Sequence, residues 1–130
     1  MIYYHASPNK FDFPSWEHIE MPADKPAKAY LGFYVTPQIE FAQSLCGPEN
    51  HLYEVVCPGA KILEYDHGEF VRRYNLFQTC DDPVAEYIQW RNILECDILA
   101  LIESDGRCGE LCIVNLECIK KFTELSNMLK

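Results

Sequence analysis

Glu110 is the residue whose setting most directly suggests chemistry. It begins an apolar segment, residues 110–116, that is predicted to be a strand. Because alternate residues of a strand share a face, Glu110 lies with Cys112 and Val114 on a face that is otherwise apolar. A carboxylate buried there must be paired or hydrogen-bonded, since its unpaired burial costs several kcal/mol. Either Glu110 has a partner in a site, or it lies at the strand tip and reaches water through the preceding turn.

An imidazole and a phenol on two other predicted strands are further candidates. His5 lies near the end of a strand over residues 2–6, and Tyr34 lies in a strand over residues 30–36. A histidine at a strand end can be a satisfied structural residue, and aromatic residues of strands usually belong to the core. No nucleophile-elbow pattern supports a serine-based triad. Considered alone, these residues leave structural and catalytic roles open.

Three short segments resemble, in order and approximate spacing, the strands of the NAD pocket in ADP-ribosyltransferases of the diphtheria-toxin and poly(ADP-ribose) polymerase branch. Residues 4–7 (Tyr-His-Ala-Ser) resemble the strand with the pattern hydrophobic-His-Gly-Ser/Thr. Residues 32–36 (Gly-Phe-Tyr-Val-Thr) resemble the strand that carries the family's tyrosine and precedes a helix. Residues 110–115 (Glu-Leu-Cys-Ile-Val-Asn) resemble the strand that begins with its glutamate. Their order and approximate spacing hold over nearly the whole chain.

The resemblance implies a catalytic triad of His5, Tyr34 and Glu110, with NAD as co-substrate and no metal. His5 would hydrogen-bond ribose hydroxyls, Tyr34 would stack on the nicotinamide ring, and the Ala6 backbone would bind the carboxamide. Glu110 would hold the 2′-hydroxyl of the nicotinamide ribose and stabilise the positive charge that develops when nicotinamide leaves. The residues expected to contact NAD are His5, Ala6, Ser7, Gly32, Tyr34 and Phe41.

The chain departs from the family pattern at two positions. Ala6 replaces the glycine that usually follows the histidine, which is expected to narrow the nicotinamide pocket. Polymerising members carry a second tyrosine one helix after the first, where this chain offers Phe41 and Leu45. With no long insertion to bind a growing polymer, the expected reaction is transfer of a single ADP-ribose unit.

The elements that must position these residues are predicted to form one α+β domain over residues 1–130. The resemblance implies a split β-sandwich of two small antiparallel-rich sheets with peripheral helices. Neighbouring strands are expected to pair as hairpins. One helix is expected to begin with Thr36 as N-cap, and another to begin at Asp82-Pro83. Strands are predicted at 2–6, 30–36, 51–57, 60–65, 98–103, 110–116 and 119–123, and helices at 14–20, 37–45, 67–76 and from 83 onward.

Composition limits the classes of function. With 130 residues and 48% hydrophobic residues the chain is expected to fold, and no apolar run reaches the roughly 18 residues of a membrane span. No signal peptide is visible, so a cytoplasmic location is expected. The net charge of −9 argues against direct nucleic-acid binding. The seven cysteines form no CxxC pair and are expected to be mainly core residues of a reduced protein.

The leading functional hypothesis is a mono-ADP-ribosyltransferase that modifies a protein. Its small size and acidity resemble minimal transferases of phages and mobile elements, including anti-CRISPR and toxin-like enzymes. The expected target is then a host or defence protein, with a basic nucleic-acid-binding protein as one candidate. Two alternatives remain. One is an NAD glycohydrolase, in which water replaces the acceptor, and the other is a non-catalytic acidic binding protein on a degenerate transferase fold.

Overall fold

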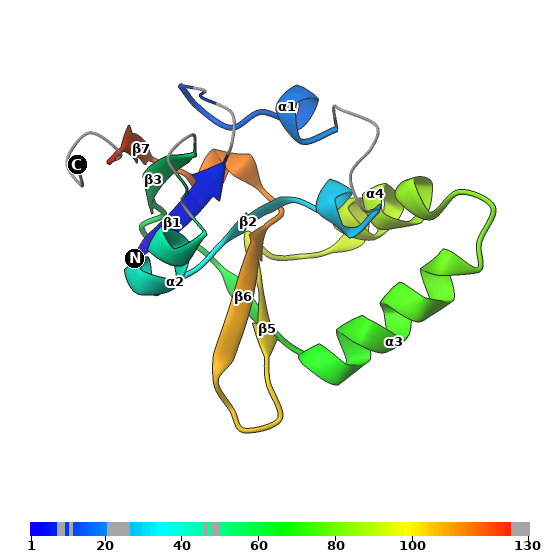
Figure 1. Cartoon of the computed structure of the whole chain (residues 1–130). Helices are drawn as coiled ribbons and strands as arrows, with labels where there is room; N and C mark the ends of the chain where they lie inside the picture. The colour runs from blue at the N-terminus through cyan, green and yellow to red at the C-terminus, as the bar shows by residue number, and fades with distance from the viewer. Residues whose placement is uncertain (8–9, 11, 21–26, 46, 48–49, 126–130) are drawn as a thin grey trace.

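The structure, a computed structural model, describes residues 1–7, 10, 12–20, 27–45, 47 and 50–125. It has two β-sheets, with helices along one side of the second (Figure 1). The chain is therefore of the α+β class that its pattern predicts. Among the described residues, no helix is long and apolar enough to cross a membrane.

The first sheet, here called sheet A, is entirely antiparallel. Its central strand pairs with the first strand in continuous register from Ile2 opposite Val56 to Ser7 opposite His51. The last strand pairs on the other side, with Tyr53 opposite Glu124. In order across the sheet the strands are β1 (Ile2–Ser7), β3 (His51–Val56) and β7 (Lys121–Glu124).

The second sheet, sheet B, is mixed. Among the described strands, β5 and β6 are the one pair of consecutive strands in this sheet that forms a hairpin. Strands β4 and β5 pair in parallel. Hairpin pairing of the third and fourth strands was a wrong prediction, because the Pro58-Gly59 turn, with φ of 67° at Gly59, carries the chain from one sheet to the other. In order across the sheet the strands are β2 (Phe33–Val35), β6 (Cys108–Ile113), β5 (Ile98–Ile102) and β4 (Ile62–Asp66).

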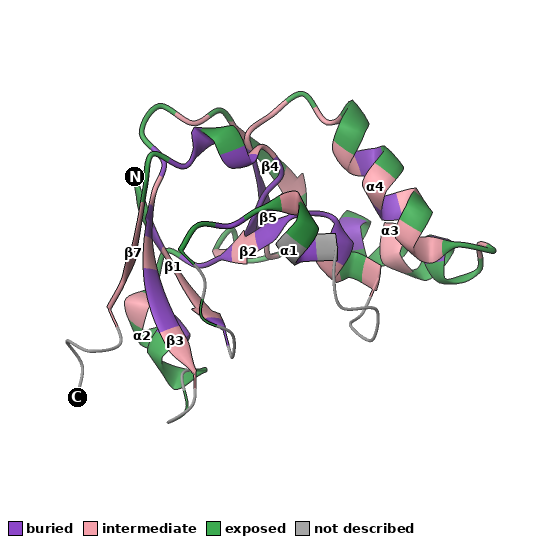
Figure 2. Ribbon diagram, turned by 90° about the horizontal axis from the view of Figure 1, so that it is seen from above, coloured by how far each residue is buried: buried purple, intermediate pink, exposed green. Residues whose placement is uncertain are grey.

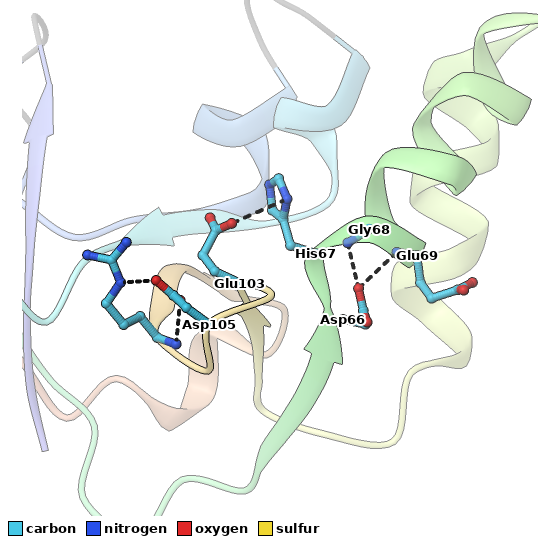
Figure 3. A network of polar contacts seen from close by, with 7 residues as sticks. Asp66, His67, Gly68, Glu69, Glu103 and Asp105 are labelled. Atoms are coloured by element: carbon cyan, nitrogen blue, oxygen red, sulfur yellow. Dashed lines mark hydrogen bonds and ion pairs between the residues drawn. The ribbon is translucent and has the colours of Figure 1, made fainter.

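Two helices make the crossover between the parallel strands. Asp66 caps α3 (His67–Gln78) by accepting hydrogen bonds from the backbone N–H groups of Gly68 and Glu69 at 2.6 and 3.3 Å (Figure 3). Asp82 caps α4 (Pro83–Ile93) by accepting from Ala85 N at 3.1 Å. This second start, a carboxylate followed by proline in the first turn, confirms the prediction.

The three layers bury two cores, one on each face of sheet B (Figure 2). Leu111 and Ile113 face sheet A, while Cys112 and Val114 face α3 and α4. The alternation predicted for this strand is therefore confirmed. Each fully buried aliphatic side chain contributes about 1.5–3 kcal/mol of transfer free energy, so β6 anchors both cores.

A backbone bridge joins the two sheets. Tyr4 N donates to Thr36 O at 2.8 Å, and Thr36 N donates to Tyr4 O at 2.9 Å. Because Thr36 is engaged in this bridge, the helix that follows it begins later than predicted. Helix α2 (Ile39–Ser44) has Gln38 at its N-cap and no side-chain cap there, so the expected Thr36 cap is wrong.

The remaining elements are short helices that connect or cover the strands. Helix α2 packs against β1, and the 3₁₀ helix η1 (Ala27–Tyr30) packs against α4. Helix α1 (Trp16–Glu20) contacts η1, and the 3₁₀ helix η2 (Leu116–Cys118) leads from β6 to β7. Residues 46 and 48–49, which follow α2, lie outside the described residues.

Candidate functional site

A cavity of about 130 Å³ opens where β1, β2 and α2 meet, beside the bridge that joins the sheets. Strands far apart in the sequence supply its walls, and α2 with the residue that follows it supplies one side. An engineered apolar cavity of about 150 Å³ is large enough to hold benzene, so this one matches a single ring-sized group. Its lining is Tyr4, His5, Ala6, Tyr34, Val35, Thr36, Phe41, Ala42, Leu45 and Glu110.

Most of the residues predicted for the site line this one cavity. His5, Tyr34 and Glu110 are among them, together with Ala6 and Phe41. They come from β1, β2, α2 and β6, and only the fold brings them together. The arrangement places an imidazole, a phenol and a carboxylate around a space with predominantly apolar walls.

Ser7 and Gly32 are not among the residues that line the cavity, and the structure gives each another setting. Ser7 is buried opposite His51 on sheet A. A Cβ at Gly32 would overlap the carbonyl oxygen of Ile113 and approach the Cys112 sulfur at 2.7 Å. Gly32 therefore allows the chain to pass close to β6, which is a packing requirement and needs no ligand.

The His5 ring is held in place by its neighbours. Its Nδ1 lies 2.6 Å from the backbone carbonyl oxygen of Tyr34, and a carbonyl can only accept. Nδ1 therefore carries the proton and donates, which fixes the tautomer. The ring also lies 4.1 Å from that of Phe33, centroid to centroid, with 33° between the planes. Both contacts fix the imidazole at the junction of the two sheets.

The Tyr34 side chain is fixed at its hydroxyl group. Its hydroxyl donates to the backbone carbonyl of Lys28 at 2.8 Å. Burial raises the pKa of this phenol well above its ordinary value, and the nearby Cys112 thiol and Glu110 carboxylate raise it further. Tyr34 is therefore a neutral phenol at physiological pH, and its ring can act only as a hydrogen-bonding and stacking surface.

Glu110 lies on the same face of sheet B as Tyr34. Tyr34 pairs directly with Cys112, and Glu110 is two residues before Cys112 on β6. The carboxylate is exposed, so of the two settings left open by the sequence the one that reaches water is correct. The cause is a shift of register, since Leu101 pairs with Glu110 but Ile102 pairs with Cys108. This irregularity at Gly109 changes the direction of the strand where it leaves the core.

Two apolar side chains form the outer wall. Phe41 and Leu45 are four residues apart, one in α2 and one just after it, and 46% and 54% of their surfaces are exposed. Exposed apolar side chains beside a cavity often mark a binding surface. Here they could cover one face of a planar ring whose other side meets β1 and β2.

Sequence reasoning missed several residues of this region. Tyr4 and Thr36 line the cavity because their bridge forms its inner end, a contact that no local pattern indicates. His51 is another residue that it missed, because its Nδ1 lies 2.6 Å from Glu124 Oε2. The two residues are 73 positions apart, so only the order of strands in sheet A reveals the pair.

The described part of the chain contains no group of three or more His, Cys, Asp or Glu side chains arranged to hold a metal ion. The six cysteines it includes are free thiols, and Cys57, Cys112 and Cys118 are buried as predicted for core residues.

Comparison with protein-family models, with curated proteins and with solved structures finds no match to this chain. The functional argument therefore depends on the geometry of the cavity.

Proposed function

We propose that this protein is an NAD-dependent mono-ADP-ribosyltransferase that transfers ADP-ribose to a target protein and releases nicotinamide. One observation carries the proposal. His5, Tyr34 and Glu110, whose order in the chain suggested the triad, line a single ring-sized cavity. Two small sheets that meet at this cavity are also what a split β-sandwich of this class would have.

The backbone of Ala6 supports a role in binding the carboxamide. Tyr4 directs both its N–H and its C=O toward Thr36. The backbone N–H and C=O groups of successive residues in a strand point alternately to its two edges. The N–H and C=O of Ala6, two residues after Tyr4, therefore point to the same edge as those of Tyr4, away from β3 and beyond the bridge. Ala6 lines the cavity. A carboxamide needs one donor and one acceptor, and the N–H and C=O of one residue provide both.

The nicotinamide ring would lie between Tyr34 and the apolar wall of Phe41 and Leu45. Stacking on an aromatic side chain contributes about 0.5–1.5 kcal/mol beyond the area it buries. The carboxylate of Glu110 would then lie beside the nicotinamide ribose, where cleavage of the glycosidic bond generates positive charge. A preorganised electrostatic contact of this type contributes on the order of 10²–10³ in rate.

The target is proposed to be a protein with a basic surface. The chain carries a net charge of −9, and Glu110 is exposed at the mouth of the cavity, where an acceptor would approach. Complementary charge raises association rates and disfavours wrong partners. Water in place of that acceptor would make the protein an NAD glycohydrolase with the same pocket.

The direct test is incubation of the purified protein with labelled NAD, with and without a cell lysate, while released nicotinamide and protein-bound label are measured. Label on a lysate protein supports the transferase, and nicotinamide release without any lysate supports the glycohydrolase. The melting temperature gives an independent readout, because a ligand at 100 times its Kd adds about 2.7 kcal/mol to stability. If millimolar NAD does not raise the melting temperature and no protein acquires label, the enzymatic proposal is wrong and an acidic binding protein is favoured.

A further inference from the structure

Two buried cysteines meet in the core between the two sheets, outside the cavity described above. Cys57 directly follows β3 and is fully buried, and Cys118 lies at the end of η2 with 8% of its surface exposed. Both belong to the buried cluster on the side of sheet B that faces sheet A. Neither residue lines the candidate site. The pair is therefore a separate feature with chemistry of its own.

The pairing of β3 with β7 brings these two cysteines together. Val56 lies opposite Lys121, and the carbonyl oxygen of Val56 accepts from Lys120 N at 2.8 Å. The residue after Val56 is Cys57, and the 3₁₀ turn of η2 places Cys118 two residues before Lys120. At this end of the sheet the two thiol groups hydrogen-bond to each other. Their contact joins segments that are far apart in the chain.

The contact makes one of the two sulfur atoms the better nucleophile. The Cys118 thiol donates to the Cys57 sulfur, which lowers the pKa of the Cys57 thiol below its ordinary value. Burial opposes this shift, and the positively charged N-terminus supports it. The same hydrogen bond, together with burial, raises the pKa of the Cys118 thiol, so Cys118 keeps its proton. A cysteine with a lowered pKa beside a second thiol is the arrangement in which an oxidised sulfur is resolved to a disulfide.

We propose that Cys57 and Cys118 form a reversible disulfide when the protein meets a peroxide. The Cys57 thiolate attacks one oxygen of hydrogen peroxide, so an S–O bond forms, the O–O bond breaks and hydroxide leaves. The Cys118 sulfur then attacks the Cys57 sulfur, releases its proton and displaces the oxygen as hydroxide. In total, two thiols and one hydrogen peroxide give one disulfide and two water molecules. A dithiol reductant reverses the change by thiol–disulfide exchange.

The position of the pair gives a small oxidant access to it. Cys118 lies in a short 3₁₀ helix beside the exposed Glu117, and hydrogen peroxide is only slightly larger than water. The new bond would tie the end of β3 to η2 and close the long loop between them. Such a loop restricts the unfolded chain, so the oxidised protein is expected to be the more stable form. The inference is independent of the proposed function.

The test treats the purified, reduced protein with hydrogen peroxide and maps its cysteines by mass spectrometry without reduction. A peptide pair that joins Cys57 to Cys118 is expected, with the loss of two hydrogen atoms from the intact protein. The melting temperature is expected to rise by about 5–10 °C and to return when dithiothreitol is added. Cys57→Ala and Cys118→Ala should each abolish both changes. Cys80→Ala, at a partly exposed cysteine just after α3, is the matched control and should retain them.

Three results would overturn the inference. Both cysteines could remain free for alkylation when the treated protein is unfolded, or peroxide could convert them to sulfinic acids without a link. Linked peptides that contain other pairs of cysteines would also contradict it. The map is made on the wild-type protein, so it decides the question even where a variant does not fold. No arm of the experiment contains NAD, and none of its outcomes bears on the proposed transferase.

Discussion

Tyr4 and Thr36 exchange both of their backbone hydrogen bonds, at 2.8 and 2.9 Å, and by doing so they join two sheets that are otherwise separate. The bridge places the end of β1 beside the start of α2. It also leaves the backbone of Ala6 directed into the space beyond the last contact between the strands. The candidate site therefore exists because β1 pairs with the second sheet only at the Tyr4–Thr36 bridge, and the backbone beyond the bridge is left to line the cavity.

Glu110→Gln tests the electrostatic role of the carboxylate. The amide keeps the size of the side chain but cannot stabilise positive charge on the ribose, so nicotinamide release is expected to fall by about 10²–10³. Because Glu110 is exposed, the melting temperature should stay within about 2 °C of wild type, as for surface changes in general. Glu117→Gln, at an exposed position outside the cavity lining, is the control. Equal turnover in all three proteins would remove Glu110 from the mechanism.

Tyr34→Phe separates the hydrogen bond of Tyr34 from the ring. The change removes the bond to the Lys28 carbonyl and is expected to cost about 1 kcal/mol in the free energy of unfolding, measured with urea. The ring is retained, so NAD affinity should remain close to wild type. Tyr34→Ala, in contrast, is expected to weaken NAD binding about tenfold because it removes the stacking surface. Equal NAD affinity in both variants would show that the nicotinamide does not stack there.

The sequence predicts those features of the structure that depend on contacts between residues close together in the chain. The faces of β6 follow from the alternation around Cys112, and the start of α4 follows from Asp82 and the proline after it. Sheet membership does not follow, because β3 pairs with strands from the two ends of the chain. The sequence left the exposure of Glu110 open between two settings, because the choice depends on a shift of register against β5.

Gly32→Ala is expected to destabilise the protein by about 1–3 kcal/mol. The added methyl group would meet the backbone carbonyl of Ile113, which cannot move without disturbing β6, so the cost is that of overpacking. Gly47→Ala is the control, because no atom lies within 4 Å of the corresponding Cβ. Unfolding in urea measures both. A Gly32→Ala protein as stable as the control would contradict the close approach of these segments.

Asp97 links three strands and makes the stability of the protein depend on pH. Its carboxylate accepts from Lys61 N and Asn115 Nδ2, each at 2.8 Å. These hydrogen bonds lower its pKa, so the ionised form is the one that stabilises the fold. The contribution is complete above the ordinary carboxyl pKa of about 3.9 and is lost as pH falls through the lower pKa of the folded state.

The corresponding measurement is the free energy of unfolding of wild type and Asp97→Asn from pH 2 to pH 7. The group is partly exposed, so a difference of about 1 kcal/mol is expected at pH 7 after solvent screening. The difference should shrink toward zero at the acid end. Asp12→Asn, at an exposed position, is the control. A difference that is constant with pH would show that the charge of Asp97 has no part in it.

Leu45→Tyr tests the outer wall of the cavity by adding a second tyrosine ring to it. Leu45 lines the cavity and is 54% exposed, so a larger side chain has room to extend over a bound ring. An added aromatic contact contributes about 0.5–1.5 kcal/mol, and NAD affinity is therefore expected to rise about two- to tenfold. Gln43→Tyr, on α2 but not among the lining residues, supplies the matched control for a new exposed tyrosine. If both variants change NAD affinity equally, or if Leu45→Tyr leaves it unchanged, the ring does not bind between α2 and Tyr34.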